Sequence, residues 1–229
     1  MIIDNFCLIK TLLDFNDKDD FYFLQIIQRK KDGNDVQSAN NGYRTIKTYY
    51  IRSLEDFERR KDAIIQLCEQ NNARAYINLN VRNAREIALV AAKAYIDLVR
   101  EDRCSQGHRV YDHVCGTTPK MGVKKKWIVD IDGLTDDEVD LICEKICNCR
   151  SAFPVGHPIA PPCYFDNIIA RIPTAHGVHI ITHGFDIKRF REILEQTIAL
   201  DLTDKQIKEI TDIKKDNPTL LYFNKKEIF

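Results

Sequence analysis

The second half of the chain places short apolar segments and amphipathic segments in an order that few folds accommodate. Strand-like runs occupy residues 127–132, 167–172, 178–182 and 219–223, and helical patterns begin at Thr135 and at Asp186. The order is strand, helix, strand, strand, helix, strand. It predicts the βαββαβ sheet of ferredoxin-like and RNA-recognition-like domains, in which the first and third strands are adjacent.

The first half predicts a separate α/β unit. Two β-like runs, 21–30 and 43–51, flank a polar stretch and indicate a hairpin, and helical patterns follow at 53–68 and 83–99 around a short strand at 73–79. Residues 101–126 show little periodicity and are interpreted as an irregular connection. We therefore predict an α/β (α+β) protein with an N-terminal α/β unit at 1–123 packed on a βαββαβ unit at 124–229, forming one compact two-part domain.

Composition narrows the class of protein. The chain has 34 basic and 34 acidic side chains, so it lacks the excess of positive charge typical of dedicated nucleic-acid binders. No apolar run reaches the ~18–20 residues that span a bilayer, and the N-terminus does not resemble a secretory signal. We expect a protein with no membrane partner, located in the cytoplasm (the host cytoplasm if a phage encodes it).

Two acidic residues and one histidine fall on the predicted adjacent strands. Asp130 and Asp132 are two residues apart on the first strand, so their carboxylates project from one face. Paired carboxylates repel each other unless a cation lies between them. If His179 on the third strand faces the same way, an imidazole stands beside the carboxylates. The alternatives are a strand-end acidic pair at Gly133 and a core histidine.

These two segments resemble a known enzyme superfamily. Trp127–Gly133 (WIVDIDG) is similar to the first catalytic motif of archaeo-eukaryotic primases and primase-polymerases, and 173–182 (PTAHGVHIIT) is similar to their second motif. The resemblance implies that Asp130 and Asp132 bind Mg²⁺ or Mn²⁺ and that His179 contacts the phosphates of a nucleoside triphosphate. It also implies an α/β unit packed on an RNA-recognition-like unit.

The remaining site residues are assigned less directly. The superfamily has a third acidic motif, for which Asp216 is the best candidate because the last predicted strand should border the first. We also predict nucleotide-binding roles for Arg171, Arg82, Lys126 and Thr174. Arg29, Lys30 and Lys31, at the end of the first hairpin strand, are further candidates for binding triphosphate or a template backbone.

The eight cysteines permit a zinc site or ordinary buried thiols. One set is Cys143, Cys147, Cys149 and Cys163, placed after the Asp-x-Asp strand as the zinc knuckle of primase small subunits is. Another is Cys104, His108, His113 and Cys115. Neither set contains a Cys-x-x-Cys pair, so buried or free thiols are the leading interpretation.

The sequence thus predicts a small metal-dependent nucleotidyltransferase of the primase-polymerase type. It would join a nucleoside triphosphate to the 3′-hydroxyl of DNA or RNA and depend on a protein partner in replication or repair. One alternative is a degenerate relative that binds nucleotide or nucleic acid without catalysis, in replication, repair or interference with host defence. Another is a haloacid-dehalogenase-like phosphatase, whose motif also begins Asp-x-Asp-Gly, with Asp130 as nucleophile.

Overall fold

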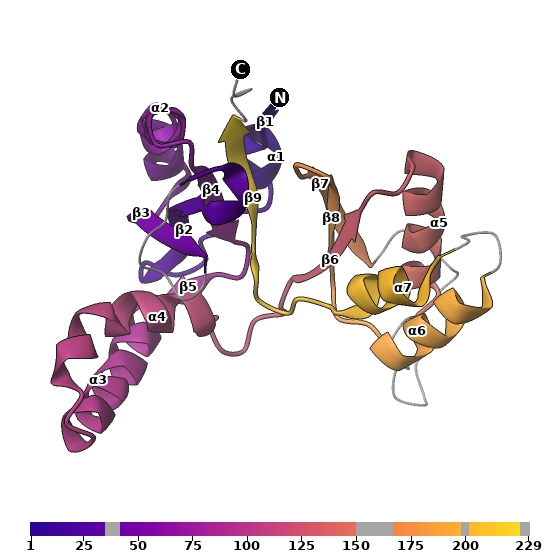
Figure 1. Cartoon of the computed structure of the whole chain (residues 1–229). Helices are drawn as coiled ribbons and strands as arrows, with labels where there is room; N and C mark the ends of the chain where they lie inside the picture. The colour runs from indigo at the N-terminus through magenta and orange to yellow at the C-terminus, as the bar shows by residue number, and fades with distance from the viewer. Residues whose placement is uncertain (35–41, 150–166, 198–201, 225–229) are drawn as a thin grey trace. The chain divides into compact units, whose positions relative to one another are not determined.

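The computed structural model describes residues 1–34, 42–149, 167–197 and 202–224, and the chain divides into two compact units. Unit 1 comprises Met1–Val123 together with Pro218–Phe229, and unit 2 comprises Lys124–Asn217. Helices and antiparallel strands occur in both units (Figure 1), so the chain is a mixed α/β (α+β) protein as predicted.

Unit 1 is built on a six-stranded sheet. The strands follow the spatial order β1 (Ile2–Asp4), β9 (Pro218–Asn224), β4 (Arg74–Asn78), β2 (Asp20–Arg29) and β3 (Tyr43–Ile51), with β5 (Arg82–Asn83) paired to β2. The predicted hairpin is present as the antiparallel pair β2–β3.

Two helices of unit 1 begin directly after polar side chains that cap them. Helix α2 (Leu54–Gln70) starts after Ser53, whose side chain accepts a hydrogen bond from Asp56 N, and α3 (Ala84–Arg100) starts after Asn83, whose side chain accepts from two backbone N–H groups. The unit also contains α1 (Phe6–Lys10), α4 (Val110–Thr117) and the short 3₁₀ helices η1 (Lys30–Asp32) and η2 (Cys104–Arg109). The predicted irregular connection at 101–126 is therefore wrong for η2 and α4.

The last strand, β9, corrects the predicted topology. It was expected to complete the second sheet beside Trp127–Asp132, but it pairs with β4 and β1 of unit 1. In Figure 1 it is the yellow strand among indigo and purple ones. Five consecutive residues of β9, Thr219–Phe223, are buried. Such a strand needs a central place in a covered sheet, which unit 1 provides.

Unit 2 contains a three-stranded antiparallel sheet covered on one face by helices. The strand order is β6 (Trp127–Asp132), β8 (Gly177–Thr182), β7 (Ile168–Pro173), and the helices are α5 (Asp136–Cys147), α6 (Ile187–Gln196) and α7 (Asp204–Thr211). Val129, Ile131 and Ile180 project into a core formed with residues of all three helices, among them Ile142, Phe190 and Ile210. The expected adjacency of the first and third strands is observed.

The register between β6 and β8 depends on a close approach of their backbones. Gly177 lies opposite Asp132, and a Cβ built at Gly177 would stand 1.9 Å from the carbonyl oxygen of Ile131. Only glycine fits there without displacing a strand. Directly after β6, Gly133 takes φ +72° and donates its N–H to His176 O.

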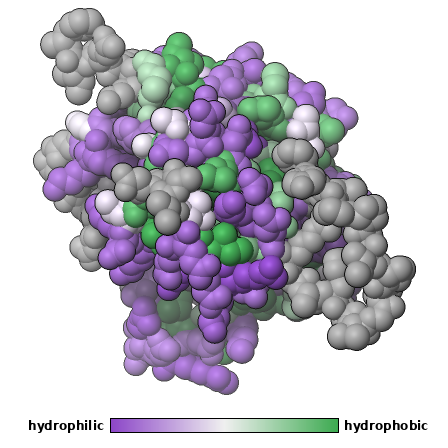
Figure 2. Space-filling model, turned by 90° about the vertical axis from the view of Figure 1, so that its right-hand side faces the viewer, coloured by the Kyte–Doolittle hydropathy of each residue, from purple (hydrophilic) through white to green (hydrophobic). Residues whose placement is uncertain are grey.

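The surface combines hydrophilic residues with smaller apolar patches, as the face in Figure 2 shows. Helix α3 presents exposed apolar side chains at Leu89, Ile96 and Val99. No helix in the described ranges combines the length and apolar composition needed to cross a lipid bilayer.

We predict that Gly177→Ala destabilises unit 2 by about 1–3 kcal/mol, because the added methyl group overlaps the Ile131 carbonyl. Urea unfolding followed by the fluorescence of Trp127, the single tryptophan and a residue of unit 2, measures the change. Gly116→Ala is the matched control, since its Cβ would meet Phe23 at an ordinary 3.7 Å. Equal stability of Gly177→Ala and the wild type would contradict the proposed close approach.

Candidate functional site

The structure brings Asp130 and His179 together. The two residues are directly opposite each other in the β6–β8 register, and His179 Nε2 lies 3.3 Å from Asp130 Oδ1. Asp132 lies two residues farther along β6, opposite Gly177, and therefore shares the same face. Asp130, Asp132 and His179 form the cluster that we call the Asp–His site.

Exposure at the Asp–His site decreases from the carboxylates to the imidazole. The Asp130 side chain is 46% exposed and that of His179 is 13% exposed, while Asp132 is an exposed residue. Toward the other end of the β6–β8 pair, the same face carries Ile128 and Ile181, which are 2% and 0% exposed. The site is thus an acidic edge that reaches solvent, with one partly buried imidazole behind it.

The β7–β8 turn holds the His179 strand in place. Thr174 Oγ1 accepts a hydrogen bond from Gly177 N (3.1 Å), and Thr174 N donates to Gly177 O (2.9 Å). These contacts give Thr174 a structural role in the turn, which sequence reasoning did not assign to it. Its nucleotide-binding role stays a prediction.

Arg171 does not join the Asp–His site, contrary to the sequence interpretation. It lies opposite Ile180, whose side chain is in the helix-covered core, whereas its neighbour Ile172 lies opposite His179. Arg171 therefore projects from the other face of the sheet, where Nη1 forms an ion pair with Asp140 Oδ1 of α5 at 2.5 Å. Period-two alternation applies only within one strand, so the face of Arg171 depends on the β7–β8 register, which the structure supplies.

Arg82 is a buried structural residue of unit 1. Its side chain is 0% exposed, with Nε donating to Cys115 O (2.8 Å) and Nη1 donating to Asn80 O (2.6 Å). These bonds occupy carbonyl groups in α4 and in the strand-to-helix junction. The guanidinium is thus used inside the fold, which corrects its predicted role as a nucleotide ligand.

Asp216 lies on a segment that runs antiparallel to β6, so it is displaced away from Asp130 and is poorly placed as a third metal ligand. Lys214 and Ile128 exchange two backbone hydrogen bonds (2.8 and 2.9 Å), and Lys215 Nζ stands 5.0 Å from the Trp127 ring centroid. From Lys214 onward the chain therefore moves toward the start of β6 and away from Asp130.

One acidic residue that the sequence analysis missed lies on the Asp130 side of this segment. Asp212 precedes Lys214 and forms an ion pair with it. Because the segment is antiparallel to β6 at Ile128, Asp212 is displaced toward the Asp130 end. The bridge between Ile128 and Lys214 could not be inferred from sequence, since Lys214 belongs to no recognisable strand.

Lys126 lies at the opposite end of β6 from the carboxylates. It is four residues from Asp130, roughly 13 Å along an extended strand. Its neighbourhood includes His183, whose pKa is lowered by burial and by the charges of Lys124 and Lys126. Lys126 therefore contributes positive charge near His183, and its predicted contact with nucleotide remains untested.

The described cysteines of the first zinc set belong largely to the core of unit 2. Cys143 and Cys149 are 2% and 0% exposed and pack with Val139 and Ile146. Burial raises the pKa of both thiols, to about 11 for Cys149. Packing among apolar side chains is the role that the structure gives these two thiols. Cys163 lies outside the described residues.

In the second set, Cys104 and Cys115 do not share an environment. Cys115 is fully buried between α4 and the sheet of unit 1, and Cys104 is exposed on η2. His108 is engaged locally: Nδ1 lies 2.9 Å from Ser105 O, and Nε2 accepts from Arg109 Nε at 3.1 Å.

The donor chemistry of the Asp–His site fits Mg²⁺ or Mn²⁺ only together with a substrate. Two exposed carboxylates on one face are the ligands such ions take when phosphate oxygens complete the coordination. No three His, Cys, Asp or Glu side chains in the part of the chain that the structure describes gather into a metal-holding group. Asp130 and Asp132 would therefore hold a cation that arrives with a phosphate ligand.

Comparisons with protein-family models, with curated proteins and with solved structures find no match to this chain.

We predict that Arg82→Gln lowers the free energy of unfolding by about 1.5–3 kcal/mol, because buried carbonyl oxygens lose charged donors. Chemical denaturation followed by circular dichroism measures the change. Arg85→Gln, at an exposed position three residues away, is the control. A fully stable Arg82→Gln protein with weakened nucleotide affinity would restore the ligand role.

His183 gives a prediction for pH dependence. Since its folded-state pKa lies below the ordinary 6.5, the unfolded chain takes up a proton first as the pH falls. The contribution of neutral His183 is complete above pH 6.5 and is lost between that value and the folded-state pKa. His183→Gln should therefore show a smaller drop in Tm than the wild type between about pH 7.5 and about pH 5.5. The exposed His113→Gln is the matched variant, and equal drops for His183→Gln and the wild type would contradict the assignment.

Proposed function

We propose that this chain is a primase-polymerase-like nucleotidyltransferase that binds a nucleoside triphosphate with a divalent cation at the Asp–His site and transfers it to a nucleic-acid 3′-hydroxyl. The observation that supports the proposal is the placement of His179 Nε2 beside Asp130 Oδ1, with Asp132 on the same face. A cation with phosphate at Asp130 would lie within reach of the imidazole.

Each residue has a separate task in this proposal. Asp130 and Asp132 hold the cation through carboxylate oxygens at the exposed edge of β6. The cation, when bound, neutralises phosphate charge and favours displacement at the transferred phosphorus. His179, held by strand pairing and partial burial, donates a hydrogen bond to a phosphate oxygen and orients the triphosphate.

The sheet topology argues against the phosphatase alternative. A haloacid-dehalogenase-like site needs its Asp-x-Asp strand in a parallel, doubly wound sheet. In this chain β6 pairs antiparallel with β8, and β8 pairs antiparallel with β7. Asp130 is therefore better interpreted as a metal ligand than as a nucleophile.

A second candidate function is nucleotide binding without transfer. The course of the 214–216 segment favours it, because Asp216 moves away from Asp130 and Asp212 is already paired with Lys214. With two carboxylates, the site can hold one cation with triphosphate more readily than the two cations of in-line transfer.

The proposal also leads us to expect a particular substrate, cellular location and protein partner. A nucleotidyltransferase of this type would use a DNA or RNA primer or template in the cytoplasm, and a replication or repair protein would bring it to that substrate. If it binds only nucleotide, the same site would serve replication, repair or interference with host nucleotide signals.

We predict that Asp130→Asn weakens Mn²⁺-dependent binding of a nucleoside triphosphate by roughly tenfold or more, the equivalent of one charge-assisted contact. Isothermal titration calorimetry with a non-hydrolysable triphosphate, with and without Mn²⁺, measures the effect. Asp140→Asn is the matched control, because Asp140 is an exposed carboxylate of α5 that pairs with Arg171 on the other face.

Primer extension with the same proteins separates the two functions. Extension by the wild type and its loss in Asp130→Asn support transfer, and Mn²⁺-dependent binding without extension supports the second candidate. Equal binding by Asp130→Asn and the wild type would reject both.

A further inference from the structure

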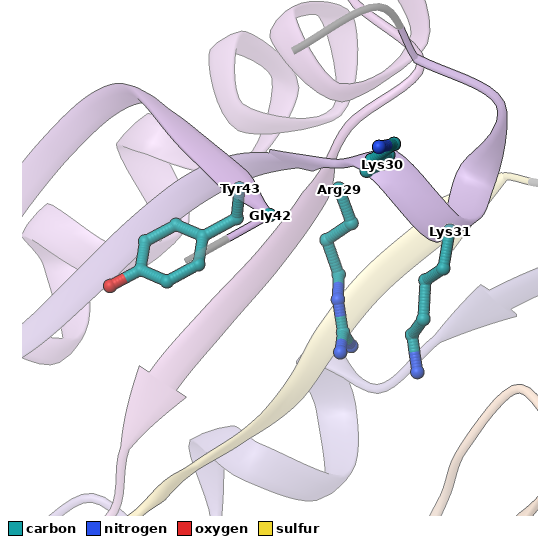
Figure 3. Close-up of a pocket in the computed structure, with 5 residues that line it drawn as sticks. All are labelled: Arg29, Lys30, Lys31, Gly42 and Tyr43. Atoms are coloured by element: carbon teal, nitrogen blue, oxygen red, sulfur yellow. The ribbon is translucent and has the colours of Figure 1, made fainter. Parts of the chain in front are cut away.

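The end of the β2–β3 hairpin forms a second candidate site, in unit 1. A pocket of about 460 Å³ is lined there by Arg29, Lys30, Lys31, Gly42 and Tyr43 (Figure 3). Of the five described residues that line it, three are cations and none is acidic. We call this the hairpin pocket.

Backbone pairing fixes the positions of these cations. Arg29 lies opposite Tyr43 in the strand register, and Lys30 N donates to Gly42 O at 2.8 Å. Arg29 Nη1 also donates to the Tyr76 hydroxyl at 2.9 Å, which orients the guanidinium. Figure 3 shows the side chains of Arg29 and Lys31 extending in the same direction from the strand end and the turn after it.

Asp32, the acidic residue of η1, is already paired with an arginine. Asp32 accepts hydrogen bonds from Arg74 Nε (2.7 Å) and from Arg74 Nη2, and both side chains are 6% exposed. Arg74 in turn stacks over Phe223, with its guanidinium carbon 4.1 Å from the ring centroid. This buried pair consumes the charge of Asp32, so Asp32 does not neutralise the cations of the hairpin pocket.

The pocket also offers an aromatic surface. Tyr43 is 42% exposed, next to the consecutive cations. Cations that follow a backbone, together with an accessible ring on which a base can stack, are the combination by which proteins bind single strands without sequence preference. A duplex keeps its bases stacked internally and cannot use the ring.

We propose that the hairpin pocket binds single-stranded nucleic acid, with Arg29, Lys30 and Lys31 on successive phosphates and Tyr43 under a base. The inference uses none of the residues of the Asp–His site, so it holds whether or not that site binds nucleotide. It identifies a part of unit 1 that would hold a nucleic-acid strand.

The test is fluorescence anisotropy of the full chain with a labelled dT oligomer of about 12 nucleotides, within the usual range of single-strand sites. Lys30→Gln with Lys31→Gln should weaken binding about 25-fold at about 0.1 M salt and reduce the slope of log K against log salt by about 1.4, as expected for two lost phosphate contacts. Both lysines are exposed, so these changes spare the core.

Lys93→Gln with Lys188→Gln is the charge-matched control, since both lysines are exposed and lie on α3 and α6. It should keep the wild-type salt slope. An equal loss in the control, or no loss in the Lys30/Lys31 variant, would overturn the proposal.

Tyr43 tests the stacking contact separately. Tyr43→Leu should weaken binding about fivefold or more, and Tyr43→Phe should bind as the wild type does. Stronger binding of the matching duplex would reject the assignment. So would displacement of the oligomer by a mononucleotide, or by polyglutamate at equal charge concentration, because either result would show a different ligand. Asp130→Asn should bind the oligomer normally, which separates this result from that of the Asp–His site.

Discussion

The pairing of β6 with β8 is the constraint on which the candidate chemistry of this protein depends. Side chains alternate between the two faces of a sheet, so a slip of one residue would move His179 into the helix-covered core and away from Asp130. Gly177 lets the two backbones approach closely enough to hold the observed register. The Thr174 turn and the bond from Gly133 N to His176 O then secure the end of the strand pair at Asp132 and Gly177.

Local structure could be predicted from the sequence because its causes are local. Strand β6 covers the predicted residues, and α5 begins with the capping box of Thr135 and Glu138 that the sequence indicates. The Asp130–His179 pairing follows from two such local predictions and one topological rule about adjacent strands. Period-two alternation and strand order made the shared face a prediction, and the register of β6 with β8 confirms it.

Pairings between distant segments could not be predicted in the same way. An apolar run such as β9 indicates a strand that is buried on both faces, but it does not indicate which sheet contains that strand. In the structure β9 pairs with β4 and β1 and not with β6. The roles of the arginines were equally ambiguous, because a guanidinium can donate hydrogen bonds either to a bound ligand or to buried carbonyl groups of the protein. Arg82 bonds to carbonyl oxygens inside unit 1, and Arg171 pairs with Asp140 on the covered face. The hairpin pocket combines both levels: sequence shows its three cations, and only the structure shows that Asp32 is committed to Arg74.

The most direct test of the Asp–His site is paramagnetic broadening of histidine imidazole signals in NMR spectra. Mn²⁺ is added in substoichiometric amounts with a non-hydrolysable nucleoside triphosphate, and assignments come from single His→Gln variants. We predict strong, selective broadening of His179, which lies beside Asp130, and weaker broadening of His183, which lies four residues farther along the chain, roughly 13 Å in extended backbone. The selective effect should disappear in Asp130→Asn. An unbroadened His179 signal, or equal broadening of His179 and His183, would contradict a metal–triphosphate site at Asp130 and Asp132.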